Sequence, residues 1–383
     1  MVIVNYAINP MRKNNLERLI DEMGQTRLSI YGLRAIGEGS TLTYKEAREF
    51  ASIVLGLAEN TRSAQLGILL GGLMASTPTV ETVAGVIDAI FDYEEYNPLD
   101  NETYLSGVVG VAGSGKKSWK TANITTAATL VAATGGARIA KAVSGATSSV
   151  CGSADMFRML GCTLSQDIDV ILEQLEETGL GIFEIEHLIP RFDSIYGGLF
   201  HAPHLLSLGF PALLIPLRVD SFCYGLAHPA TTLSRCVIER YRPGDVVTVA
   251  CHVSECRWID ELTTIGVNQI SRSSSVPHPA TISKTLSELF ERRQTKNFDE
   301  EALRQIAGAS TPRDQLELML AILQGVAHPE LLYTVALNAG LLLEMATGCT
   351  FIEGFNLAMS ILHDSASMAT LDRYIKFGSI SKK

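Results

Sequence analysis

Two apolar runs between residues 107 and 161 alternate with polar loops that are rich in glycine and serine. Each run is short and partly β-branched, which predicts a strand, and each loop leads into a segment that predicts a helix start. The pattern therefore predicts strand, loop and helix twice in succession. In chain order these segments are 108–111, 113–120, Asn123, 137–141, 143–149 and Gly152-Ser153.

Helical periodicity dominates on both sides of this stretch. Thr43 and Glu46 have the spacing of a capping box, and Thr77-Pro78 predicts another helix start. Residues 236–241 and 246–253 predict buried strands that are joined by a turn at 243–245. The predicted helices are 16–23, 47–57, 62–75, 78–93, 166–178, 282–293, 313–324, 330–345 and 352–363.

Strands that alternate with helices from 105 to 260 predict a mostly parallel sheet covered by helices. The predicted fold class is therefore α/β, with a small N-terminal helical domain and a large α/β domain. The cluster at 97–101 is a plausible hinge. We place the helical domain at 1–98 and the α/β domain at 99–383.

Composition narrows the class of protein. The 383 residues are 46% hydrophobic and 19% charged, which is typical of a globular chain. The net charge of −10 disfavours a nucleic-acid-binding protein. No apolar run reaches the roughly 18 residues of a membrane span, and the N-terminus lacks the features of a secretory signal. Seven scattered cysteines without a CxxC pair argue against a disulfide framework and favour a reducing cytoplasm.

The two loops have the chemistry of an anion site. The first N–H groups of a helix have no intrahelical partner, and glycine lets a backbone approach a ligand closely. Such a site suits a phosphorylated anion, although glycine loops also serve simply as tight turns. The charged and hydroxyl side chains available there are Lys116, Lys117, Lys120, Thr125, Thr126, Ser148 and Ser149.

Four motifs in this order resemble the anthranilate phosphoribosyltransferase family (glycosyltransferase family 3), which is related to the thymidine phosphorylases. The family has a GTGGDG-type loop, NIST, a KHGNR-type loop and SGSAD. Here the corresponding segments are GSGKKS at 113–118, NITT at 123–126, KAVSG at 141–145 and GSAD at 152–155. WIDEL at 258–262 resembles the GLDEI motif, and GGLFHAP at 197–203 resembles the FLFAP segment. The resemblance covers roughly residues 42–375.

The resemblance implies a homodimeric, Mg²⁺-assisted phosphoribosyltransferase with the nucleoside phosphorylase/phosphoribosyltransferase fold. Part of 180–205 would pack on the helical domain. Phosphoribosyl diphosphate (PRPP) would bind the α/β domain, and the nitrogen of a small-molecule acceptor would attack C1 of the ribose. Asp260, Glu261 and Thr125 would hold Mg²⁺, although an Asp-Glu pair alone is often an ordinary turn. The implied substrate-binding residues are Gly113, Ser114, Gly115, Lys116, Lys117, Asn123, Thr125, Thr126, Lys141, Ser149 and Ser153.

Three departures from the family pattern bear on the acceptor and the metal. Lys117 stands where the family has an acidic residue, and with Lys116 it could neutralise phosphate and reduce the need for one metal. Residues 142–145, AVSG, replace the polar groups that follow the family's lysine. The arginine that contacts the anthranilate carboxylate has no visible counterpart. We therefore expect an aromatic or amine acceptor different from anthranilate.

Two other functions remain open. A phosphorylase-type relative would cleave a nucleoside with phosphate, and a non-catalytic relative would bind a nucleotide, a nucleic acid or a partner through the same cleft. Among the histidines, His201 beside the FLFAP-like segment is the first candidate for an acid–base group. The alternative for each histidine is a packed structural role.

Overall fold

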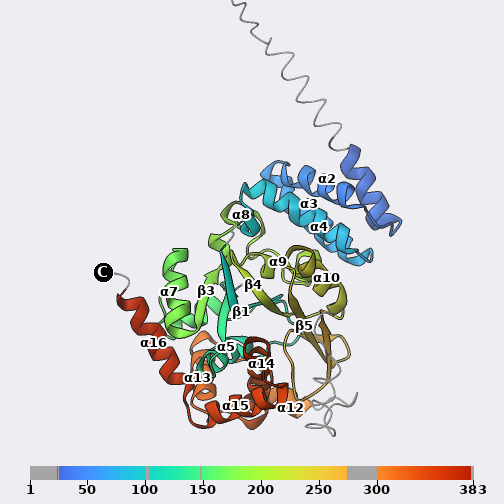
Figure 1. The fold of residues 1–383 in the computed structure, drawn as a ribbon. Helices are drawn as coiled ribbons and strands as arrows, with labels where there is room; N and C mark the ends of the chain where they lie inside the picture. The colour runs from blue at the N-terminus through green and yellow to red at the C-terminus, as the bar shows by residue number, and fades with distance from the viewer. Residues whose placement is uncertain (1–23, 25, 101–102, 147–148, 274–299, 381–383) are drawn as a thin grey trace, which may run out of the picture. The chain divides into compact units, whose positions relative to one another are not determined.

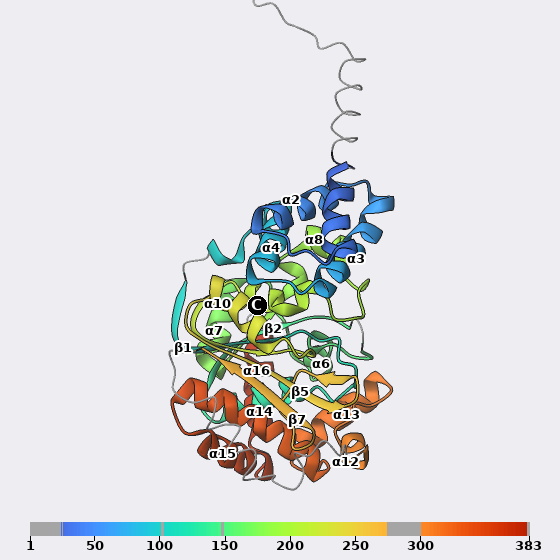
Figure 2. The same ribbon diagram turned by 90° about the vertical axis from the view of Figure 1, so that its right-hand side faces the viewer.

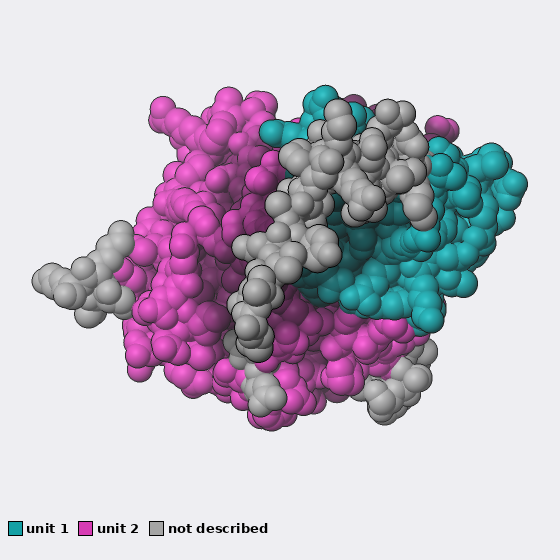
Figure 3. Space-filling model, turned by 90° about the horizontal axis from the view of Figure 1, so that it is seen from above, with its two compact units in different colours: residues 1–93 teal, residues 94–383 magenta. Residues whose placement is uncertain are grey.

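The computed structural model describes residues 24, 26–100, 103–146, 149–273 and 300–380. The chain forms two compact units, residues 1–93 and 94–383, which are coloured separately in Figure 3. The domain boundary at 98 and the packing of 180–205 stay predictions. The predicted helices at 16–23 and 282–293 lie outside the described residues, as does Ser148. Among the described helices, none combines the length and the hydropathy that a membrane crossing needs.

The first unit is helical. As predicted, Thr43 forms a capping box: its side chain accepts from the Glu46 N–H, and Glu46 accepts from the Thr43 N–H at 2.9 Å. Such a cap stabilises a helix by about 1 kcal/mol. The third helix begins at Val80 rather than Pro78, because Thr79 accepts from the Thr82 N–H. The elements are η1 (Leu33–Gly37), α2 (Tyr44–Leu55), α3 (Glu59–Ala75) and α4 (Val80–Glu94).

A seven-stranded sheet forms the centre of the second unit, with the order β3-β2-β1-β4-β5-β6 and β7 paired to β5. The strands from β3 to β5 pair in parallel, whereas β6 and β7 run antiparallel to β5. This confirms the mostly parallel sheet. The strands are β1 (Tyr104–Gly113), β2 (Arg138–Val143), β3 (Leu180–Glu184), β4 (Arg218–Gly225), β5 (Asp245–Ser254), β6 (Arg257–Ile259) and β7 (Val267–Arg272).

Helices cover both faces of this sheet (Figures 1 and 2). α5 (Ile124–Thr134) and α14 (Pro329–Thr347) lie on one face, and α9 (Phe210–Leu213) and α10 (Thr231–Tyr241) lie on the other. The remaining helices are η2 (Pro98–Asp100), α6 (Ser153–Met159), α7 (Ile168–Thr178), η3 (Ile185–His187), α8 (Pro190–Tyr196), η4 (Leu205–Leu208), α12 (Glu300–Gln305), α13 (Pro312–Leu323), α15 (Phe351–His363) and α16 (Ser367–Ile380).

The predicted strand at 236–241 is wrong, because this segment is the second half of α10. The buried residues of that helix are Thr231, Ser234, Val237 and Ile238. Their spacing of three and four follows the period of a helix, and a window of six residues was too short to show it. The strand predicted at 246–253 is correct and forms most of β5.

α5 is held in place by its buried residues, which pack against the sheet and α14. All but two of its residues are buried, and it packs against β2, β3 and α14. α14 meets α15 closely at Gly340 and Gly354: a Cβ atom at Gly340 would lie 2.7 Å from the Phe355 nitrogen. These helices therefore form a rigid layer beneath the loop that precedes α5.

Candidate active site

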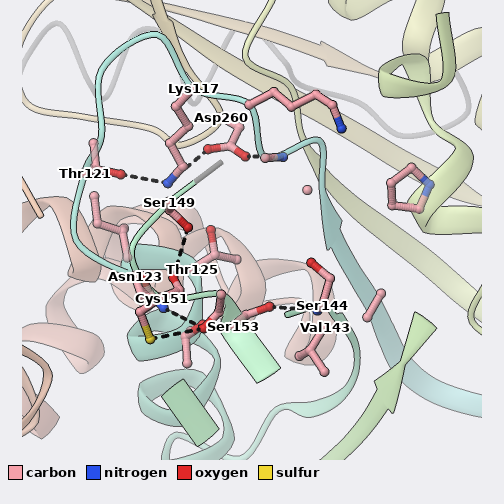
Figure 4. A pocket seen from close by; sticks show the side chains of 18 of the residues that line it. Lys117, Thr121, Asn123, Thr125, Val143, Ser144, Ser149, Cys151, Ser153 and Asp260 are labelled. Carbon is pink, nitrogen blue, oxygen red and sulfur yellow. Dashed lines mark hydrogen bonds and ion pairs between the residues drawn. The ribbon is translucent and has the colours of Figure 1, made fainter. Parts of the chain in front are cut away.

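The loops that follow β1 and β2 open onto one pocket of about 160 Å³, lined entirely by residues of the second unit (Figure 4). The carboxyl ends of neighbouring parallel strands meet at one edge of a sheet, which is where ligands of α/β proteins commonly bind. Most of the predicted site residues meet here. Those that line the pocket are Gly113, Gly115, Lys116, Lys117, Asn123, Thr125, Thr126, Lys141, Ser149, Ser153, Asp260 and Glu261.

Two predicted site residues lie outside the pocket lining. The Ser114 hydroxyl accepts from the Ala227 N–H at 3.0 Å, and the Ser114 N–H donates to the Gly225 carbonyl at 2.8 Å. Ser114 therefore fastens the first loop to the end of β4. His201 is exposed and is not among the lining residues. The substrate-binding role of Ser114 and the catalytic role of His201 stay predictions.

The first turn of α5 lines the pocket, and the N–H of its first residue, Ile124, donates to the Ala122 carbonyl at 2.7 Å. Asn123 makes no side-chain cap bond to the helix. Its amide instead donates to the Gly152 carbonyl at 3.3 Å and accepts from Gln315 at 3.2 Å. Thr125 and Thr126 lie in the first turn, where N–H groups have no intrahelical acceptor. This turn can donate to an anion, and it carries partial positive charge.

The second loop is held by two acidic side chains to which the sequence analysis assigned no role. Asp155 accepts from the N–H groups of Ala146 at 2.8 Å and Gly152 at 2.9 Å, and Glu186 accepts from the Gly145 N–H at 2.8 Å. A Cβ atom at Gly152 would lie 2.3 Å from the Gly145 backbone. The loop is therefore folded tightly onto α6, and the protein itself already uses these three backbone donors.

The acidic doublet follows β6 and meets the first loop, although Lys117 and Glu261 lie 144 residues apart in sequence. The Lys117 ammonium donates to Thr121 at 2.7 Å, forms an ion pair with Asp260 at 3.2 Å, and is hydrogen-bonded to Glu261. Figure 4 shows the ammonium between Thr121 and Asp260. The Gly115 N–H donates to the other Asp260 oxygen at 3.2 Å. The structure thus joins the doublet to the loop through a lysine.

Two further residues position the doublet. Asn338 on α14 accepts from the Leu262 N–H at 3.0 Å and donates to the Leu262 carbonyl at 2.8 Å, which fixes the chain directly after Glu261. At the end of β4, a Cβ atom at Gly225 would lie 2.1 Å from the Asp260 carbonyl oxygen. Only a residue without a side chain fits there.

Burial shifts the pKa values of several pocket groups. Burial lowers the pKa of Lys141, which is 4% exposed, to about 8. Burial and the charge of Lys120 together lower the pKa of Lys116 to about 8. Burial, with the charge of Asp260, raises the pKa of Glu261, although Lys117 opposes this shift. A bound anion would stabilise the protonated form of these lysines.

Lys116 belongs to a polar array that sequence reasoning missed. Its ammonium donates to the Tyr196 hydroxyl at 3.3 Å and lies 5.5 Å from the centre of the Tyr196 ring. The same hydroxyl lies 3.0 Å from Nε2 of His204. Burial and the charge of Lys116 lower the pKa of His204 to about 3. No local sequence pattern indicates a role for Tyr196. One of its partners, Lys116, lies in the first loop, and the other, His204, follows a turn.

The doublet fits a divalent cation that is shared with a phosphate ligand. Oε2 of Glu261 is buried, and no hydrogen-bond partner for it occurs among the described residues. Mg²⁺ is commonly held by one or two carboxylates together with water and substrate phosphates. In the part of the chain that the structure describes, no group of three or more histidine, cysteine or acidic side chains forms a complete metal cage. The residues therefore suit a cation that arrives with its ligand.

Comparison with known proteins agrees with this architecture. Residues 105–196 match the model described as "Glycosyl transferase family, a/b domain". Anthranilate phosphoribosyltransferase from Dictyoglomus thermophilum is 34% identical over 178 residues, or 46% of this chain and 49% of that protein. The enzyme of that name from Shewanella loihica is 27% identical over 325 residues, or 82% of this chain and 86% of its own. The match thus spans about half the length of the first relative and most of the second.

The fold extends the similarity along the chain. The structure of anthranilate phosphoribosyltransferase from Saccharomyces cerevisiae in complex with PRPP and Mg aligns with a TM-score of 0.66 and 16% identity. The alignment covers 92% of this chain and 98% of the yeast chain. The comparisons thus support the resemblance found in the sequence: residues 105–196 match the α/β domain of the glycosyl transferase family, and the chain has the fold of the anthranilate phosphoribosyltransferases.

Proposed function

We propose that this protein is a phosphoribosyltransferase that transfers the 5-phosphoribosyl group from PRPP to a small-molecule acceptor, with Mg²⁺ as its cofactor. One observation carries the proposal: the N-terminus of α5, the buried Lys141 and the acidic doublet line a single pocket. This combination offers backbone donors, a cation and carboxylates to one ligand. A sugar diphosphate that arrives with a divalent cation needs all three.

In this mechanism the residues bind and orient PRPP and stabilise its leaving group. The bond between C1 of the ribose and the diphosphate oxygen breaks, and its electron pair leaves with the diphosphate. The acceptor nitrogen forms the new bond to C1 and loses a proton to solvent. The N–H groups of Thr125 and Thr126 would donate to the diphosphate as its negative charge grows. Mg²⁺, when bound, would supply further neutralisation of that charge.

Lys141 and Ser153 are proposed to hold the 5′-phosphate side of the sugar. Lys141 comes from β2 and Ser153 begins α6, so both belong to rigid elements. Positioning the two reactants in this way lowers the entropic part of the barrier. Ser149 also lines the pocket and is proposed to bind the same ligand.

The proposed acceptor is an aromatic or amine compound other than anthranilate. The segment after Lys141 brings Ala142, Val143, Ser144 and Gly145 to the pocket, and among these only Ser144 has a polar side chain. A carboxylate on the acceptor would therefore meet no cation from this segment. We also propose that the protein acts in the cytoplasm as a homodimer, as the resemblance implies.

Calorimetric titration with PRPP, in Mg²⁺ and in EDTA, tests the core of the proposal. Heat of binding is expected at least with Mg²⁺, and no heat under either condition would refute it. Diphosphate release in the presence of anthranilate and of a panel of other aromatic and amine acceptors then tests the acceptor. Faster release with anthranilate than with every other compound would refute the different acceptor. Release of base from nucleosides that depends on phosphate would instead indicate a phosphorylase.

A further inference from the structure

The Lys117 ammonium contacts side chains that line the pocket with it, namely Thr121, Asp260 and Glu261. An ammonium has three N–H groups. Thr121 Oγ1 and Glu261 Oε1 accept hydrogen bonds from this one, and Asp260 Oδ1 forms an ion pair with it at 3.2 Å. The Lys117 side chain is only 17% exposed, so water competes little for these contacts. Direct neutralisation of phosphate by Lys117, which its position in a glycine loop predicts, would require these contacts to break.

The acceptors around Lys117 are those that a metal ion would use. Asp260 and Glu261 present side chains that are 7% and 2% exposed. Two buried carboxylates without a cation would repel each other strongly. Lys117 places one positive charge against both. A lysine in place of an acidic residue changes the formal charge of this site by two units, which equals the charge of one divalent cation.

Lys117 also connects the doublet to the first loop. Its backbone lies in the loop, and its ammonium lies on the doublet, beside the contact between Gly115 and Asp260. The protein's own groups therefore attach the loop to the carboxylates. Two doublet oxygens, Oδ1 of Asp260 and Oε2 of Glu261, have no hydrogen-bond partner among the described residues, although Oδ1 forms the ion pair with Lys117.

We propose that the Lys117 ammonium is a built-in replacement for one divalent cation. It neutralises the Asp260–Glu261 doublet permanently, so that the ligand-free protein binds divalent cations weakly and PRPP binding depends only partly on Mg²⁺. The claim about PRPP binding rests on the proposed function. The claim about binding of divalent cations concerns the protein alone and is tested without PRPP.

Binding of Mn²⁺, measured by the loss of the paramagnetic signal of the free ion, tests the claim that the protein binds divalent cations weakly. The variant Lys117→Met keeps the length of the side chain and removes its charge. Lys116→Met is the matched control, because it removes a neighbouring pocket lysine whose ammonium donates to Tyr196. We expect Lys117→Met to bind Mn²⁺ at least about tenfold more tightly than the natural protein, and Lys116→Met to resemble the natural protein. Equal affinity of Lys117→Met and the natural protein would overturn the inference.

The natural protein provides a second measurement that needs no variant. Its affinity for PRPP in excess Mg²⁺ should exceed that in EDTA by less than about tenfold, and a loss of about a hundredfold or more would overturn the inference. Thermal unfolding should show the same contrast, with Mg²⁺ stabilising Lys117→Met but not the natural protein. If PRPP fails to bind under every condition, the proposed function is refuted. The Mn²⁺ measurement still tests whether Lys117 replaces a divalent cation.

Discussion

The hydroxyl oxygen of Tyr196 lies 3.0 Å from Nε2 of His204, and both rings are packed beside the pocket loop that carries Lys116. The other ring nitrogen of His204, Nδ1, accepts from the Leu206 N–H at 3.2 Å. A neutral imidazole that accepts at Nδ1 carries its proton at Nε2, so His204 donates to Tyr196. A second proton would have to bind Nδ1, which already accepts from the Leu206 N–H.

His204 is therefore expected to remain neutral across the physiological range. Burial lowers its pKa to about 3, which means that the ring takes up a proton only in acid. Nuclear magnetic resonance of the imidazole nitrogens should show one tautomer, protonated at Nε2, from about pH 5 to about pH 9. A titration of His204 near neutral pH would contradict this assignment. Exposed His363 provides the matched control in the same spectra.

Affinity for anions should fall in alkaline solution. Lys141 has a pKa of about 8, so it is charged below that pH and loses its proton above it, and Lys116 behaves similarly. Besides burial, the groups that act on Lys141 are Asp260, Lys117, Glu261 and Cys223. The affinity for inorganic diphosphate should therefore be constant near pH 7 and decrease above about pH 8, by up to tenfold per pH unit for each lysine.

Calorimetry from about pH 7 to about pH 9.5 checks this dependence. The variant Lys141→Met should bind diphosphate more weakly and with a shallower pH slope, because it removes one of the two lysines whose pKa lies near 8. Constant affinity of the natural protein up to the highest pH would show that the lysines do not control binding.

Removal of the Asn338 side-chain amide should destabilise the chain around the doublet. Asn338→Leu keeps a similar volume but leaves the N–H and the carbonyl of Leu262 without partners. Buried, unpaired groups of this kind should reduce the free energy of unfolding by about 2–4 kcal/mol. Denaturation with urea measures the loss. Asn356→Leu, at an exposed position of α15, is the control and should change stability by less than about 0.5 kcal/mol.

The role of His201 is decided by kinetics. If His201 exchanges protons with the acceptor, His201→Ala should lower turnover and leave the affinity for PRPP nearly unchanged, because the side chain lies outside the lining of the phosphate pocket. Steady-state rates and calorimetry on the same preparation separate the two effects. Rates equal to those of the natural protein would exclude His201 from catalysis.

Short sequence patterns predicted the elements that are determined by neighbouring residues in the chain. The two strand–loop–helix units were predictable because glycines, hydroxyls and apolar runs follow one another within a few residues. The surroundings of Lys117 were not, because its partners come from a strand end 144 residues away. The sequence favoured a lysine directed at phosphate, whereas its ammonium lies against two carboxylates. The Tyr196–His204 contact was hidden for the same reason, since a turn brings these rings together.

The close approach of Gly225 to the Asp260 carbonyl has a practical consequence for engineering. At the end of β4, the glycine lets the backbone of the sheet lie directly against the backbone of the segment that carries the carboxylates. Even a methyl group at this point would move that segment outward, and with it every ligand contact it makes. A redesigned acceptor pocket should therefore leave residue 225 as it is and vary the segment after β2 instead.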